Sequence, residues 1–141
     1  MNIFIYSREQ LLKAVRNDFP FNTAVISFYD EGSEPLDLKG KPVEEISRCV
    51  NDVRWVDHPD KWHHRDFEDV AGFIQKCIDK DYDIICQCEF GVSRSSACAM
   101  AIKEYVFGNG IDVFRNYDYY PNQIFFNNIY ECLLKIGKGN Q

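Results

Sequence analysis

The chain has 141 residues, a length typical of one domain with a single hydrophobic core. Its residues are 45% hydrophobic and 27% charged, which excludes a disordered or low-complexity chain and predicts one globular domain over residues 1–141. The formal net charge of -6 argues against nonspecific binding to nucleic acid, because that binding needs a cationic surface.

The N-terminal segment predicts a short strand followed by a helix. Residues 2–6 (NIFIY) are apolar enough for a strand. Ser7 and Gln10 have the spacing of a capping box, which predicts a helix over residues 8–16. The segment lacks the basic region and cleavage site of a secretory signal, and no apolar run is long enough for a membrane span. We therefore expect a cytoplasmic protein without a membrane partner.

Two more strand candidates follow. Residues 23–29 (TAVISFY) are rich in β-branched and aromatic residues, as a buried strand should be. Residues 53–56 (VRWV) are a weaker candidate that runs into a polar segment.

The second half of the chain alternates helices with one strand. Apolar residues at helical spacing predict a helix over 66–80, and residues 83–87 (DIICQ) predict a strand covered on both faces. Residues 95–108 predict a largely buried helix that Gly108 ends, and a last helix begins near Pro121. This alternation predicts a single α/β domain with a mainly parallel central sheet flanked by helices.

The six cysteines lie mostly in apolar segments, where a free thiol acts as a small hydrophobic side chain. We expect most of them to be reduced core residues. Cys86 and Cys88 form a Cys-x-Cys pair, but no second pair stands at metal-ligand spacing, so no metal site is expected.

Residues 88–94, here named the Cys88 loop, join the predicted strand 83–87 to the next helix. Ligands in such sheets bind beyond the carboxyl ends of the strands. A helix N-terminus and a nearby arginine lower the pKa of a thiol, so Cys88 is a candidate nucleophile. The loop is short enough to curl around one tetrahedral anion with its amides pointing inward, and Arg94 adds a bidentate donor. The predicted phosphate-binding residues are Glu89, Phe90, Gly91, Val92, Ser93 and Arg94.

The sequence CEFGVSRS resembles the Cys-x5-Arg-Ser signature of the cysteine-based protein tyrosine phosphatase superfamily, and GVSRS is most similar to its dual-specificity branch. The resemblance implies that Cys88 attacks phosphorus, that Arg94 holds the phosphoryl oxygens and that Ser95 assists breakdown of the phosphocysteine. Residues 120–129 (YPNQIFFNNI) resemble the Pro-Asn segment that opens the last helix of small dual-specificity-like domains. Gln87 stands where the family usually has histidine.

The resemblance also implies a general acid, an aspartate about thirty residues before the cysteine. Asp57 lies 88 − 57 = 31 positions upstream and Asp60 lies 88 − 60 = 28 positions upstream. We favour Asp57, because it follows the strand candidate 53–56, and keep Asp60 as the alternative. Solvated loop carboxylates without a role are the remaining interpretation.

The resemblance implies hydrolysis of phosphomonoesters without a cofactor or a metal. We expect the substrate to be phosphotyrosine, phosphoserine or phosphothreonine of a protein, or a small phosphomonoester. A catalytically weak phosphate-binding module is an alternative that Gln87 keeps open. Two further alternatives rank lower: nucleic-acid 5′ phosphates because of the acidic balance, and phosphoinositides because the loop lacks extra lysines. The sequence predicts no oligomeric state.

Overall fold

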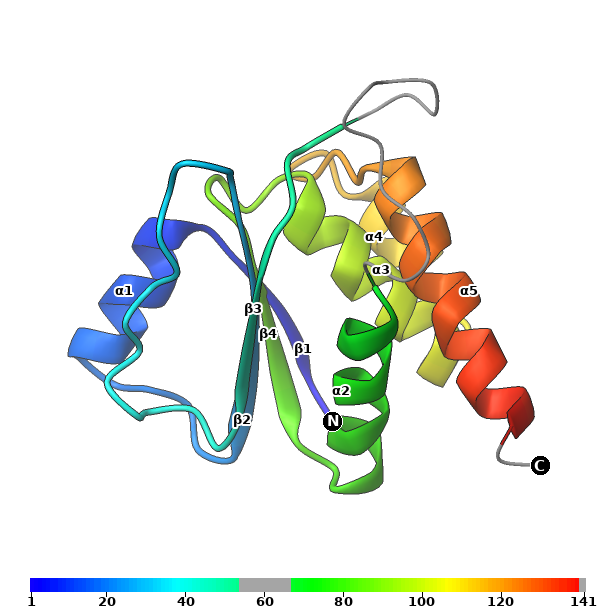
Figure 1. The fold of residues 1–141 in the computed structure, drawn as a ribbon, viewed down its shortest axis with the longest axis horizontal. Helices are drawn as coiled ribbons and strands as arrows, with labels where there is room; N and C mark the ends of the chain where they lie inside the picture. Colours follow the sequence, from blue (N-terminus) through cyan, green and yellow to red (C-terminus); the bar gives the residue numbers. More distant parts are fainter. Residues whose placement is uncertain (54–66, 140–141) are drawn as a thin grey trace.

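The computed structural model describes residues 1–53 and 67–139 of the chain. A central sheet has one helix on one face and the remaining helices on the other (Figure 1). The described strands are β1 (Ile3–Tyr6), β2 (Thr23–Tyr29), β3 (Glu45–Cys49) and β4 (Asp83–Gln87). The described helices are α1 (Arg8–Arg16), α2 (Glu68–Asp79), α3 (Arg94–Phe107), α4 (Ile111–Arg115) and α5 (Gln123–Gly139).

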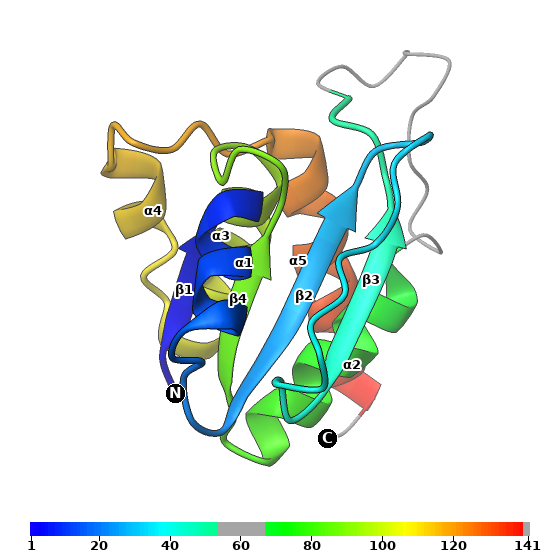
Figure 2. The same cartoon turned by 90° about the vertical axis from the view of Figure 1, so that its left-hand side faces the viewer.

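The four strands are ordered β1-β4-β2-β3, and every neighbouring pair is parallel. Cys86 of β4 lies opposite Ile5 of β1 on one side and Ile26 of β2 on the other. The arrowheads of the strands therefore point toward one edge of the sheet (Figure 2). The predicted α/β class with a parallel central sheet is confirmed.

Side chains alternate between the two faces of the sheet, as the pleat requires. Val25 and Ile85 point to the face that α1 covers, where they pack with Leu11 and Val15 in the smaller of two cores. Their strand neighbours belong to the larger core, which α2, α3 and α5 complete. The ring of Phe125 packs edge-on at its centre, with centroid distances of 4.7 Å to Phe28 and 4.9 Å to Phe67. The larger core cluster contains Ala24, Ile26, Phe28, Phe67, Ile74, Ile84, Cys86, Ile102, Phe125 and Ile129 among others.

The predicted start of α1 is confirmed in detail. The Gln10 N–H donates to Ser7 Oγ at 3.1 Å, and the Ser7 N–H donates to Gln10 Oε1 at 2.7 Å. This reciprocal pair satisfies two amides that the helix itself leaves without acceptors. The predicted helices α2, α3 and α5 and the strands β1, β2 and β4 are also present, with Gly108 in the left-handed conformation at the end of α3.

Two elements were not predicted. The edge strand β3 reads EISRC, and its two end residues are exposed, so it carries neither an apolar run nor a clear alternation. The parallel pairing with β2 stabilises this strand, although its own sequence has no strand pattern. The short helix α4 buries only Val113. The strand predicted over 53–56 is not seen at Val53, which lies in no strand, and residues 54–56 lie outside the described residues.

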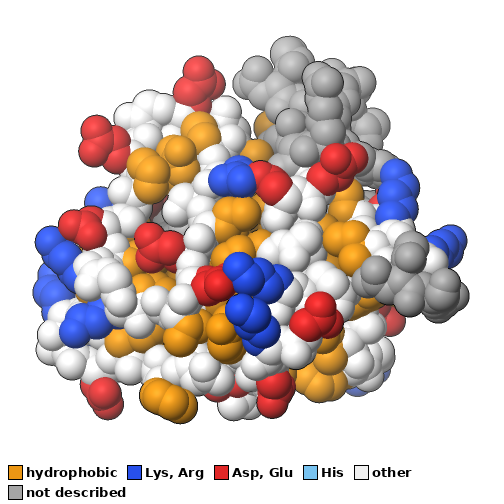
Figure 3. All heavy atoms as spheres, turned by 60° about the horizontal axis from the view of Figure 1, so that its bottom comes forward, with side chains coloured by type: hydrophobic (Ala, Val, Ile, Leu, Met, Phe, Trp, Pro, Cys, Tyr) orange, Lys and Arg blue, Asp and Glu red, His pale blue; other side chains and the backbone are white. Residues whose placement is uncertain are grey.

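On the face shown in Figure 3, acidic and basic side chains are interspersed with apolar ones. This mixture accords with 22 acidic and 16 basic residues in the sequence. Over residues 1–53 and 67–139, no helix has the length and apolar character needed to cross a bilayer.

Candidate active site

The Cys88 loop leaves β4 at the carboxyl edge of the sheet and enters α3 at Arg94. The start of α1 braces it from one side. The Arg8 N–H donates to the Glu89 carbonyl at 3.0 Å, and the Cys88 N–H donates to the Tyr6 carbonyl at 3.4 Å. Figure 2 shows the loop above the end of β4, beside α1. The central strand and two helices therefore fix the ends of the loop.

Gly91 occupies a position that only glycine fits. Its φ is +68°, in the left-handed region that side chains disfavour. A Cβ atom there would lie 2.7 Å from the backbone nitrogen of Ser7 and 3.0 Å from the carbonyl carbon of Tyr6. The close approach of the β1–α1 junction and the curl of the loop thus both depend on the absence of a side chain.

Cys88 lies at the start of the loop, directly after β4, and the residue is 3% exposed. Burial by itself raises the pKa of this thiol, but other contacts outweigh it and the pKa is lowered. The hydroxyl and the N–H of Ser95 lie 3.1 Å and 3.4 Å from Sγ, where both donate to the thiolate. The charge of Arg94 and the Gly91 N–H lower the pKa further. The site therefore favours the nucleophilic form of the sulfur.

In three other buried cysteines the pKa of the thiol is raised rather than lowered. Burial raises the pKa of Cys77 to about 12. Burial, with the contact to Cys98, raises the pKa of Cys86 well above the usual thiol range. Burial also raises the pKa of Cys132. These three thiols behave as inert core side chains, in contrast to Cys88.

Arg94 is buried, and its side chain reaches the ends of two strands. Nη1 donates to Asp30 Oδ1 at 2.8 Å and to the Val50 carbonyl at 2.7 Å. Asp30 directly follows β2, and Val50 directly follows β3. Nε is buried and has no hydrogen-bond partner in the described part of the chain.

A second carboxylate, Asp52, joins the loop to the last helix. Oδ1 of Asp52 accepts from Ser93 Oγ and from Asn122 Nδ2, each at 2.8 Å. Asn122 is fully buried, and its Nδ2 also donates to the Val53 carbonyl at 2.7 Å. Its Oδ1 accepts the Phe125 N–H at 3.1 Å in the first turn of α5. One buried amide therefore links the segment after β3, the Cys88 loop and α5.

Sequence reasoning missed Asp30 and Asp52, and it noticed Asn122 only through the resemblance of residues 120–129. Asp30 lies 64 positions from Arg94, and Asp52 lies 70 positions from Asn122. The position of Asp30 directly after a predicted strand was the only signal available for it.

Both proposed general acids, Asp57 and Asp60, lie outside the described residues. Residues 50–53, the last ones described before residue 54, contact the site. Val50 accepts from Arg94, and Asp52 accepts from Ser93. Val50 and Asp52 thus lie beside the Cys88 loop.

Exposed aromatic side chains lie on the loop, at Phe90, and beside it, at Tyr120. Phe90 is 79% exposed, and the Tyr120 N–H donates to the Val92 carbonyl at 2.9 Å. A hollow of about 470 Å³ lies on the Tyr120 side and another of about 520 Å³ on the Phe90 side. The first is lined by Phe114, Asn116, Tyr117, Tyr119, Tyr120, Pro121 and Gln123, and the second by Ser7, Arg8, Glu9, Leu12, Arg16, Glu89 and Phe90.

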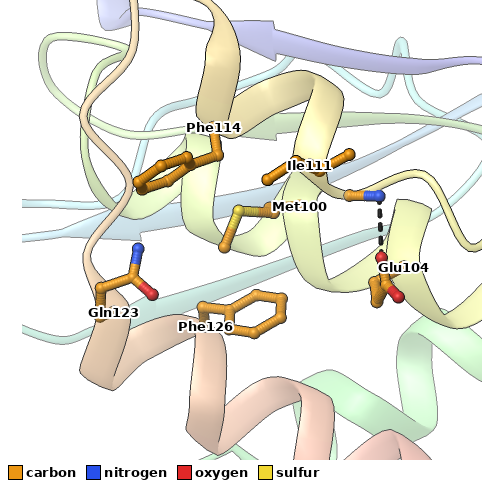
Figure 4. A pocket seen from close by; sticks show the side chains of 7 residues that line it. Met100, Glu104, Ile111, Phe114, Gln123 and Phe126 are labelled. Carbon is orange, nitrogen blue, oxygen red and sulfur yellow. Dashed lines mark hydrogen bonds between the residues drawn. The ribbon is translucent and has the colours of Figure 1, made fainter.

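A separate cavity of about 320 Å³ lies between α3, α4 and α5 (Figure 4). Met100, Phe114 and Phe126 give it an apolar lining. Glu104 Oε2 at its edge accepts the Gly110 N–H at 3.0 Å. None of its lining residues belongs to the Cys88 loop, and two of them, Phe114 and Gln123, also line the hollow on the Tyr120 side. Among the residues described, no three His, Cys, Asp or Glu side chains are grouped to hold a metal ion.

No protein-family model matches the chain, and no curated protein sequence matches it. Solved structures do match. Human DUSP28 is 12% identical, with a TM-score of 0.62 over 97% of this chain and 94% of that chain. PTPMT1 in complex with PI(5)P is 13% identical, with a TM-score of 0.61 over 99% and 95%. The human tyrosine phosphatase-like serine/threonine/tyrosine-interacting protein is 17% identical, with a TM-score of 0.58 over 92% and 86%.

At these identities the similarity concerns the fold. It extends over nearly the whole of this chain and of each matched chain. The chain therefore has the dual-specificity-phosphatase-like fold of these solved structures.

Proposed function

We propose that the protein hydrolyses phosphomonoesters through a phosphocysteine intermediate on Cys88. Two features of the site support the proposal together. The pKa of the Cys88 thiol is lowered, and the guanidinium of Arg94 is buried with an Nε that has no described partner. Both groups lie at one strand-to-helix loop, at the edge of the sheet where α/β folds bind ligands.

In the first step the Cys88 thiolate attacks phosphorus. A sulfur–phosphorus bond forms, and the bond from phosphorus to the ester oxygen breaks. The loop amides and Arg94 hold the three remaining oxygens, and donors of this kind contribute about 10²–10³ in rate each. The leaving oxygen takes a proton from the general acid, for which Asp57 remains our assignment and Asp60 the alternative.

In the second step a water molecule attacks phosphorus and the sulfur–phosphorus bond breaks. The water proton passes to the acid that lost its proton in the first step. The electron pair returns to Cys88, where the Ser95 hydroxyl at 3.1 Å donates to the departing thiolate. The products are an alcohol or phenol and inorganic phosphate.

Phosphotyrosine, phosphoserine and phosphothreonine of proteins are the proposed substrates. Glu89 is the one ionisable side chain of the loop between Cys88 and Arg94, and its negative charge disfavours ligands that carry several phosphates. The exposed ring of Phe90 offers an apolar contact beside the phosphate position. Release of inorganic phosphate from phosphopeptides and from PI(5)P, compared at equal concentration, separates protein from phosphoinositide substrates.

A weak phosphate-binding module is the second candidate, and Gln87 is the observation that favours it. Gln87 is buried and its side chain is neutral, so it adds no positive charge beside Cys88. In that case the protein would bind a phosphorylated partner and turn it over slowly.

Turnover of an aryl phosphate decides between the two functions. Hydrolysis is expected for the wild type in the presence of a chelator, and it should vanish in Cys88→Ser because serine is not ionised at neutral pH. Cys49→Ser is the matched control, since Cys49 is an exposed cysteine on β3. Turnover that survives Cys88→Ser contradicts the mechanism. Tight phosphopeptide binding without turnover by the wild type establishes the binding module.

A further inference from the structure

We propose that Asp30 is the positioning residue for Arg94. It binds Nη1 of the guanidinium, so that the edge formed by Nε and Nη2 faces the phosphate position. This inference rests on the proposed function, because it concerns how the Cys88 loop binds a phosphoryl group. Asp30 lies in no motif of the loop and contacts the site through Arg94.

The hydrogen bonds of Arg94 are concentrated on one nitrogen. Nη1 donates both to Asp30 Oδ1 at 2.8 Å and to the Val50 carbonyl at 2.7 Å. Nε, in contrast, is buried without a partner among the residues described. A buried N–H of a charged group is costly to leave unsatisfied, so this unpaired donor points to a ligand acceptor.

The nitrogen of Arg94 that is bound by protein acceptors decides which edge of the guanidinium can bind phosphate. Two parallel N–H groups on one edge bind two phosphoryl oxygens, and the edge formed by Nε and Nη2 is such a pair. Because Asp30 and Val50 both bind Nη1, this edge is free of the two anchors. Rotation of the side chain would exchange the edges, and the two anchors on Nη1 oppose that rotation.

Asp30 is suited to hold Arg94 without cancelling its charge. Its side chain is 46% exposed, whereas that of Arg94 is 5% exposed. Water screens the charge of the Asp30 carboxylate. The contact therefore fixes the orientation of the guanidinium more than it neutralises its charge. The carboxyl ends of β2 and β3 bring Asp30 and Val50 to the same nitrogen, and both ends are fixed by the parallel pairing of the two strands.

The first measurement is binding of tungstate, a tetrahedral oxyanion, by calorimetry to Cys88→Ser protein, which requires no turnover. Asp30→Ala is expected to weaken tungstate binding, and to lower kcat/KM of the Cys88 protein by about 10²-fold, the size of effect that misplacement by one ångström produces. Asp30→Asn keeps an acceptor oxygen, so a smaller loss is expected. Glu31→Ala is the matched control, because Glu31 is the exposed neighbour and its backbone N–H, which the substitution retains, makes the bond to Asn51.

Two further readouts separate positioning from a merely structural role. The loss in Asp30→Ala should be equal for good and poor leaving groups, because the phosphoryl oxygens are the same in every substrate. In an Arg94→Ala background, Asp30→Ala should add no further loss. Additive losses, or tungstate binding that Asp30→Ala leaves unchanged or strengthens, would overturn the proposal. If Asp30→Ala does not fold, Asp30→Asn decides by the same criteria.

The two proposals fail separately. Wild-type turnover together with wild-type behaviour of Asp30→Ala overturns the positioning role and leaves hydrolysis standing. Absent turnover, together with tungstate binding that depends on Asp30, overturns hydrolysis and supports the positioning role. Cys88→Ser protein that does not bind tungstate at all overturns the positioning role.

Discussion

The hydroxyl of Ser95 lies 3.1 Å from the sulfur of Cys88, and the N–H of the same residue lies 3.4 Å from it. Ser95 is fully buried in the first turn of α3, so water does not replace it. One residue thus supplies two of the contacts that lower the pKa of the Cys88 thiol.

Ser95→Ala removes the hydroxyl and retains the N–H, so the pKa of Cys88 should rise. The thiolate is the reactive form, and activity appears as the pH increases through the thiol pKa. The acidic limb of kcat/KM against pH should therefore move to higher pH in the variant. A profile that coincides with the wild-type limb would contradict this role of the hydroxyl.

The same variant should slow the second chemical step, because the departing sulfur loses a donor. Rapid mixing with an activated aryl phosphate would then show a burst of phenol release, followed by a slower steady state. The two readouts are measured on one protein and test one side chain.

Gly91→Ala should destabilise the protein and abolish oxyanion binding. Alanine at a φ of +68° costs roughly 1–2 kcal/mol, and its Cβ would also meet the Ser7 backbone. Gly108→Ala is the matched control, because Gly108 has a φ of +71° but a Cβ there would point into open space. Denaturant unfolding should show the larger loss at Gly91. Equal losses would mean that the contact with Ser7 is unimportant.

Asn122→Ala should lower the free energy of unfolding strongly. The substitution leaves acceptors on Asp52 and Val53 and the Phe125 N–H without this partner, and each buried unsatisfied group costs about 1–3 kcal/mol. Asn128→Ala is the control, since the Asn128 amide donates to the Ile124 carbonyl within the same helix, α5, and so joins no separate segments there. Comparable unfolding midpoints for the two variants would contradict the linking role of Asn122.

Asp57→Asn and Asp60→Asn separate the two candidates for the general acid. Proton donation matters most when the leaving oxygen is strongly basic. Asp57→Asn should therefore reduce turnover of an unactivated phosphate far more than that of an activated one, whereas Asp60→Asn should affect both only slightly. A leaving-group series at one pH provides the measurement. The reverse pattern assigns the acid to Asp60, and flat responses in both variants place the proton donor elsewhere.

Features that depend on neighbours along the chain were predictable from the amino-acid sequence. The capping box of Ser7 and Gln10, the apolar strands 23–29 and 83–87, and the end of α3 at Gly108 all rest on local backbone chemistry. The spacing of Cys88 and Arg94 across a strand-to-helix joint is local too, which is why the candidate nucleophile and its arginine were predictable.

The distant residues that contact the Cys88 loop were not predictable, because tertiary packing brings them there. The polar strand β3 forms because β2 pairs with it, and this pairing brings Val50 and Asp52 to the loop. Asp30 reaches Arg94 because parallel strands end at one edge of the sheet, 64 positions away in sequence. Contacts of this kind leave no periodicity or local motif in the chain, since they depend on strand order and register, which only the packing of the whole domain sets.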